Sequence, residues 1–177
     1  MSDWHDPTMA TRDEFIREVG VFLGLPKELA GIDFPPHWLP ARDGIGIEAK
    51  FPVACDGTQL GDRLTVVAVP ATRSFHINLL HVGVCVSRLD FDPMQPHPNT
   101  MFAGQDGLPS MVSGHHFHRW SINTRFIKGD GTTELLKHAE ELPTTVRTFD
   151  QALRWFCHEV NIALPHGHLV DYPGVLL

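Results

Sequence analysis

The chain has 177 residues, of which 42% are hydrophobic and 20% are charged, and these values suit a globular domain that can bury a core. Its formal net charge of −7 argues against broad, non-specific nucleic-acid binding, which depends on a basic field. No apolar run is long enough to cross a bilayer, and the acidic segment 1–6 lacks the features of a secretory signal. The sequence therefore predicts a cytoplasmic protein that makes no membrane contact. Cys55, Cys85 and Cys157 are odd in number and far apart, which favours packing roles over disulfides or a zinc knuckle.

The first predicted element is a helix over residues 12–23. Its start is indicated by the capping-box pattern Thr11-Arg12-Asp13-Glu14, in which hydroxyl and carboxylate satisfy amide donors reciprocally. Phe15, Val19 and Phe22 then recur at helical spacing, so we expect them to face the core.

The next part of the chain has the composition of strands. Residues 45–54 alternate loosely, and Leu64 to Val69 form a β-branched run. Phe75 to Phe91 form a longer run, apolar on both faces in its middle, which predicts one central strand covered on both sides. Its polar residues then share one face and lie toward the two ends: His76, Asn78, Arg88 and Asp90.

Residues 92–110 form a connection rich in Pro and Gly, which contains His97 and Asn99. Connections of this length are uncommon inside a domain and are often functional or mobile. We expect a fourth strand over 112–127 and a short helix near 133–141.

The last predicted element is a helix over 149–162. It follows a second capping-box pattern, Thr148-Phe149-Asp150-Gln151, and it places Leu153 and Phe156 on a buried stripe.

These elements predict the α+β class, with an antiparallel sheet of about four or five strands flanked by the N-terminal and C-terminal helices. The length indicates a single domain over 1–177, in which 1–10 and 165–177 are tails.

Histidine is the most informative residue type, because six of the twelve histidines lie between residues 76 and 118. His116 and His118 would point the same way on a strand. Pairing their strand beside the long one would bring them to the 92–110 loop, so we expect His97, His116 and His118 to share one pocket. His76, His81 and His115 are interpreted as local hydrogen-bonding residues.

Four short motifs recur in a familiar order: Arg88-Leu89-Asp90, His97-Pro98-Asn99, His116-Phe117-His118 and the C-terminal helix pattern of 148–162. Over residues 45–163 this order resembles a family of small, functionally uncharacterised bacterial and prophage-encoded domains. The chain departs from it in the doubled His115-His116 and in the Pro-rich loop. The resemblance implies which residues form a site, and its mobile-element setting suggests a role in phage–host conflict; it implies no reaction.

The first functional interpretation is a nucleic-acid-directed protein of toxin or defence type, a small ribonuclease that acts on RNA without a metal or other cofactor. Such cleavage needs an acid, a base and a cation for the phosphorane charge. The candidates are His97, His116, His118 and Asp90 for catalysis, Arg88 and Arg119 for phosphate, and Asn99 or Asp90 for orienting a histidine.

Two alternatives stay open. One is a mononuclear zinc or iron site with His97, His116 and His118 as ligands, since three imidazoles leave one coordination position free. A site of two histidines and one carboxylate, Asp90 or Asp92, is a variant of it. The other alternative is a non-enzymatic binding or inhibitor module with a nucleic-acid or protein partner, in which the histidines are structural.

Overall fold

The computed structural model describes residues 12–30, 37–42, 44–99, 107–124, 136–164 and 172–173. Its helices in these ranges are α1 (Arg12–Gly24), α2 (Trp120–Asn123) and α3 (Phe149–Glu159). Its strands there are β1 (Lys27–Leu29), β2 (Leu39–Pro40), β3 (Ile47–Cys55), β4 (Thr58–Val69), β5 (Ser74–His81), β6 (Val84–Phe91), β7 (His97–Pro98), β8 (Met111–Val112), β9 (His116–His118), β10 (Glu140–Glu141) and β11 (Ile162–Ala163).

One sheet contains most of these strands, in the order β10-β9-β6-β5-β4-β3-β1-β11, with β2 beside β3. Every pairing in it is antiparallel except that of β1 with β11. β7 and β8 pair separately. The predicted α+β class is confirmed, and the sheet is larger than the expected four or five strands because very short strands extend both edges.

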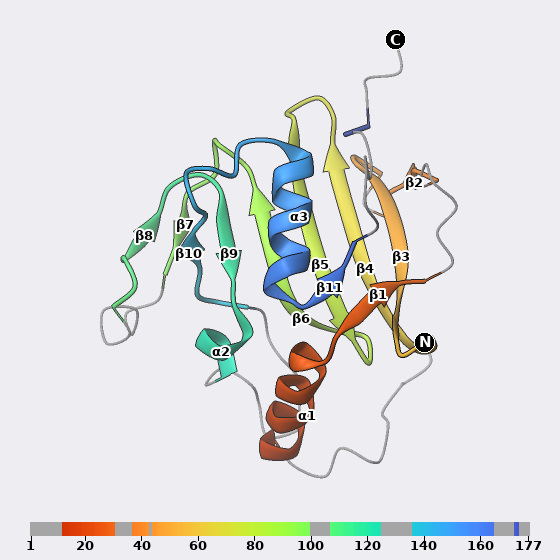
Figure 1. Cartoon of the computed structure of the whole chain (residues 1–177). Helices are drawn as coiled ribbons and strands as arrows, with labels where there is room; N and C mark the ends of the chain where they lie inside the picture. The colour runs from red at the N-terminus through yellow and green to blue at the C-terminus, as the bar shows by residue number, and fades with distance from the viewer. Residues whose placement is uncertain are drawn as a thin grey trace.

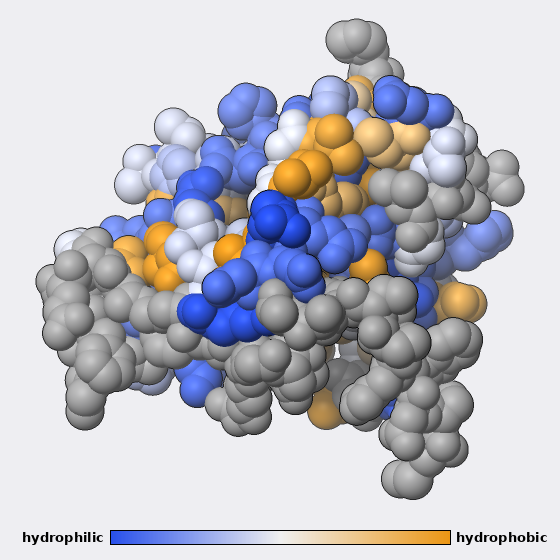
Figure 2. Space-filling view, turned by 90° about the horizontal axis from the view of Figure 1, so that it is seen from below, coloured by the Kyte–Doolittle hydropathy of each residue, from blue (hydrophilic) through white to orange (hydrophobic). Residues whose placement is uncertain are grey.

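The predicted terminal helices pack on the sheet through the expected residues. α3 lies across one face of the central strands, and α1 lies beyond their lower end (Figure 1). Phe15, Val19 and Phe22 of α1 are buried, as are Leu153 and Phe156 of α3. Thr148 and Gln151 form the predicted capping box. From below, hydrophobic residues of the described part are visible only in separate groups between hydrophilic ones (Figure 2).

The expected single strand over 75–91 is wrong, because the run folds into the hairpin β5–β6. Val82 and Gly83 both have positive φ, at 49° and 80°, as a two-residue hairpin turn requires. His76 pairs with Asp90 and Asn78 with Arg88 across the hairpin. The polar residues therefore share a face as predicted, but they lie side by side and not at two ends. Within the described part of the chain, no helix covers that face as α3 covers the other (Figure 1).

Three other expectations need correction. The strand predicted over 112–127 is replaced in its described part, 112–124, by β8, β9 and the helix α2, which begins at Trp120; residues 125–127 lie outside the described residues. The helix predicted near 133–141 is absent from its described part, where 136–139 has no regular structure and β10 follows. The C-terminal helix ends at Glu159, because Asn161 adopts a positive φ of 55° and the chain turns into β11.

The predicted tails, 1–10 and 165–177, lie outside the described residues apart from Tyr172 and Pro173. Within the described ranges, no helix has the length and apolar character needed to pass through a membrane.

Candidate functional site

The pairing of β6 with β5 and β9 brings the candidate residues together on the face of the sheet away from α3. Arg88 is opposite His118, and Asp90 is opposite His116. The intervening residue Phe117 points the other way, because its ring contacts Trp155 and Phe156 of α3. Strand alternation therefore separates a polar site from the hydrophobic core.

The predicted convergence of three histidines is confirmed. β7 places the His97 ring against the other two, with centroids 4.9 Å from His116 and 4.7 Å from His118. The His116 and His118 rings are 5.1 Å apart. One nitrogen from each imidazole lies within 4.8 Å of the other two. His118 is fully buried and His116 nearly so.

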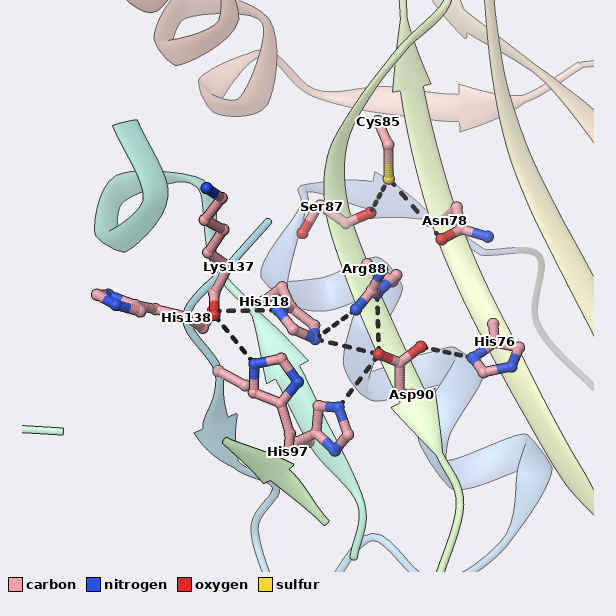
Figure 3. A network of polar contacts seen from close by, with 12 residues as sticks. His76, Asn78, Cys85, Ser87, Arg88, Asp90, His97, His118, Lys137 and His138 are labelled. Atoms are coloured by element: carbon pink, nitrogen blue, oxygen red, sulfur yellow. Dashed lines mark hydrogen bonds and ion pairs between the residues drawn. The ribbon is translucent and has the colours of Figure 1, made fainter. Parts of the chain in front are cut away.

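Each of the three rings is oriented by a backbone carbonyl. His97 Nε2 lies 3.0 Å from the oxygen of Lys137, and His118 Nδ1 lies 3.1 Å from that of His138 (Figure 3). His116 Nδ1 lies 2.7 Å from the oxygen of Gly114. A carbonyl only accepts, so these nitrogens carry the protons. The second nitrogen of each neutral ring is then an unprotonated lone pair.

The Asp90 carboxylate lies at the centre of the site. Its Oδ2 is 3.1 Å from His118 Nε2 and 3.2 Å from His116 Nε2. His76 Nδ1 donates to its Oδ1 at 2.5 Å. Arg88 forms an ion pair with Oδ2 at 2.8 Å, although that N–H is not aligned for a hydrogen bond, and its Nη2 donates to His118 Nε2 at 2.9 Å.

The environment of the site favours the neutral form of His97 and His118 and the charged form of the Asp90 carboxylate. Burial lowers the pKa of His118 to about 4 and also lowers the pKa of His97. Burial opposes ionisation of Asp90, but its contacts with the neighbouring histidines and the charge of Arg88 outweigh that cost and hold the pKa of its carboxyl well below the ordinary value. Neutral imidazole is the form in which histidine binds metals.

Two asparagines hold the backbone segment that covers the histidines. Asn99 accepts from the N–H of Ala139 at 2.8 Å and donates to its carbonyl at 3.0 Å. Asn123 makes the same pair of bonds to His138, at 2.7 and 2.9 Å. These amides replace strand pairing for 138–139, so the carbonyls that orient His97 and His118 are fixed.

The site opens into a cavity of about 480 Å³. Its lining includes His76, Arg88, Asp90, His97 and His116. A volume of this size fits a small-molecule ligand. His118 is not part of the lining.

The other predicted site residues have different positions. Arg119 forms ion pairs with Glu140 and Glu159, at 2.8 and 2.7 Å, and does not line the cavity. Asn99 contacts backbone rather than a histidine ring. The contact of His76 with Asp90 was not predicted from the sequence. The His76 side chain is 38% exposed while it makes this contact. A hairpin turn at Gly83 would have predicted that contact, since residues 76 and 90 are equally distant from it.

No protein-family model, no curated protein and no solved structure significantly matches the chain. The resemblance to the bacterial and prophage-encoded family therefore stays a prediction, and the geometry of the site is what indicates a function.

Proposed function

We propose that the protein binds one divalent transition-metal ion through His97, His116 and His118, with the Asp90 carboxylate balancing its charge. The ion would lie beside the 480 Å³ cavity, so that its remaining coordination position is open to a small molecule. The function class is thus a mononuclear metalloprotein, the second of the interpretations that the sequence allowed.

A single observation carries this proposal. The Nδ1 atoms of His116 and His118 face carbonyl oxygens, so their Nε2 lone pairs both point at one carboxylate oxygen, 3.2 and 3.1 Å away. Lone pairs and an anion at such distances repel one another unless a cation lies among them. Arg88 contacts Asp90 and His118. A bound metal ion would in addition take the lone pair of His116, while the carboxylate balances its charge.

The distances and the donor types agree with this assignment. Tetrahedral bonds of about 2.0–2.1 Å place ligand atoms roughly 3.4 Å apart, so nitrogens within 4.8 Å of one another need only small side-chain shifts. Metal-binding histidines are typically oriented by backbone carbonyls, as they are here. The carboxylate of such a site is typically hydrogen-bonded in turn, as Asp90 is to His76. Imidazole nitrogen with one carboxylate oxygen suits zinc or iron(II).

Metal analysis tests the proposal. Protein expressed without a histidine tag should hold close to one equivalent of zinc or iron after gel filtration. The double variant His116→Ala/His118→Ala should hold almost none, and His158→Ala, which removes an exposed histidine of α3, should match the wild type. Wild-type protein that is metal-free after incubation with each ion and removal of the excess would overturn the proposal.

Metal-independent ribonuclease activity is a second proposal, supported by the exposure of His76 and Arg88 to the same cavity. It is less well supported, since His118 is inaccessible and Arg119 is held by two glutamates. RNA cleavage that persists in chelator and is lost in the double variant would favour it. An RNA- or protein-binding activity that the double variant retains would favour the binding-module alternative.

A further inference from the structure

The open face of the sheet carries three cross-strand rows of side chains, which follow from the registers of β3 to β6. The first row, at the candidate metal site, is Glu48, Val67, His76 and Asp90. The second is Lys50, Thr65, Asn78 and Arg88, and the third is Pro52, Arg63, Leu80 and Cys85. Alternate residues on one strand lie about 7 Å apart, so the third row lies roughly 13 Å from the first.

These rows form the floor of a trough that continues from the cavity. A second hollow of about 420 Å³ lies next to the first one, and Asn78 and Arg88 line both. Its lining also includes Lys50, Arg63 and Thr65. The trough therefore extends from the histidines, across polar side chains of the second row, to the third row.

Charge is distributed unevenly along the trough. Arg88 is paired with Asp90, and Lys50 is paired with Glu48 at 2.5 Å. The side chain of Arg63, at the far end, makes no hydrogen bond or ion pair within the part of the chain that the structure describes. A divalent metal ion at the near end would add positive charge there, which the carboxylates that line the cavity, Asp90 and Asp92, offset in part.

We propose that the trough binds an elongated organic molecule with an anionic group at each end, one on the metal ion and the other on Arg63. This inference rests on the proposed metal site and names the substrate class for it. A guanidinium fits the geometry of a carboxylate or phosphate, and a metal ion with an open position binds an anionic oxygen. The floor between them supplies both apolar and polar contacts, from Val67, Thr65, Asn78 and Leu80.

Linear dicarboxylates of increasing length, from malonate to suberate, provide the test. Zinc-loaded protein, with its metal content measured first, is titrated with each of them by calorimetry. Affinity should increase with chain length until the molecule reaches Arg63. Arg63→Gln should weaken the binding of the longer dicarboxylates by about tenfold and leave the affinity for malonate unchanged. Arg17→Gln, on the exposed side of α1, is the matched control and should change nothing.

The two proposals fail in different ways. Protein that retains zinc but binds no dicarboxylate, or binds all lengths equally well, overturns the substrate class and leaves the metal site intact. The substrate class is also overturned, with the metal site intact, if Arg63→Gln does not change how dicarboxylate affinity depends on chain length. Protein that retains no zinc overturns the metal site itself, and the substrate class with it.

Discussion

At the residue scale the candidate site depends on Asp90, because side chains from three strands contact its carboxylate. His76 on β5, Arg88 on β6, and His116 and His118 on β9 all reach it. A buried carboxylate is costly unless opposite charge and hydrogen bonds compensate it. Arg88 supplies the opposite charge, and His76, His116 and His118 all contact the carboxylate. A metal ion held by the neighbouring histidines would add further positive charge beside it.

Arg88 occupies part of the space that the ion needs. Its Nη2 lies 2.9 Å from His118 Nε2 and uses the lone pair that the metal would take. Replacement by Met removes this competing hydrogen bond and a repelling charge while it keeps most of the apolar stem. Arg88→Met should therefore tighten zinc binding by about tenfold or more, measured by competition with a chromophoric chelator.

Arg63→Met is the control for that experiment, because Arg63 lies on the same open face but outside the lining of the cavity at the histidines. Its zinc affinity should equal that of the wild type. An Arg88→Met protein that binds zinc no more tightly than wild type would show that the guanidinium does not compete with the ion.

At the scale of elements, the junction between α1 and the sheet contains a buried cation. Lys27 of β1 donates to the carbonyls of Phe22, Leu23 and Leu25 at 2.7, 3.1 and 2.7 Å, and so satisfies the C-terminal end of α1. Burial lowers the pKa of Lys27 to about 8 from its ordinary value of 10.5. Between these two pH values the unfolded chain holds a proton that the folded protein releases. The Lys27 contribution to the free energy of unfolding should therefore rise with pH in this window.

Urea unfolding at pH 7.5 and 9.5 measures this contribution in wild type and Lys27→Met. The stability of the wild type relative to the variant should increase by about 2 kcal/mol over this interval. The buried thiols of Cys85 and Cys157, whose pKa values burial raises to about 11 and about 12, act in the opposite sense but are common to both proteins. A constant difference between the two proteins would mean that Lys27 keeps its proton throughout.

Elements with a strong local signal could be predicted from the sequence, and elements set by tertiary pairing could not. α1 and α3 were recognisable because the sequence has a capping-box pattern and an apolar stripe at each; the capping box is observed at α3, while Thr11 lies outside the described residues. The β5–β6 turn was missed because Val82 fits a strand by composition, although the run over 75–91 far exceeds the usual strand of about 5–6 residues. The 136–139 segment was missed because side chains of Asn99 and Asn123, distant in sequence, hold its backbone at His138 and Ala139. β10 was missed because only its pairing with the distant strand β9 defines it.

The same distinction applies to the site. His116 and His118 could be placed on one face by alternation alone, and the order of motifs suggested His97 as their partner. The contact of His76 with Asp90 depends on the hairpin register, and the engagement of Arg119 with Glu140 and Glu159 depends on where β10 and α3 lie. Neither register nor element placement has a local signature in the sequence.

At the scale of the whole molecule, the two faces of the sheet have separate roles. The face toward α3 carries the hydrophobic core, including Phe75, Leu89 and Phe117. The opposite face carries polar rows, a cavity and the histidines, and among the described residues β7, the segment before it and the 136–139 segment lie over it at the site. Ligands can therefore bind without disturbing the core, and the proposed ion would link β6, β7 and β9.

This arrangement predicts that metal binding stabilises the fold as a whole. A ligand that binds only the folded state at 100 times its Kd adds about 2.7 kcal/mol to the free energy of unfolding. For a domain of this size, that corresponds to a rise of about 5–10 °C in Tm. Calorimetry of the zinc-loaded protein before and after chelator treatment measures the shift. His116→Ala/His118→Ala should show no shift whatever its own Tm, and His158→Ala should show the full one. Equal Tm values for loaded and stripped wild-type protein would mean that the ion, if bound, does not join these strands.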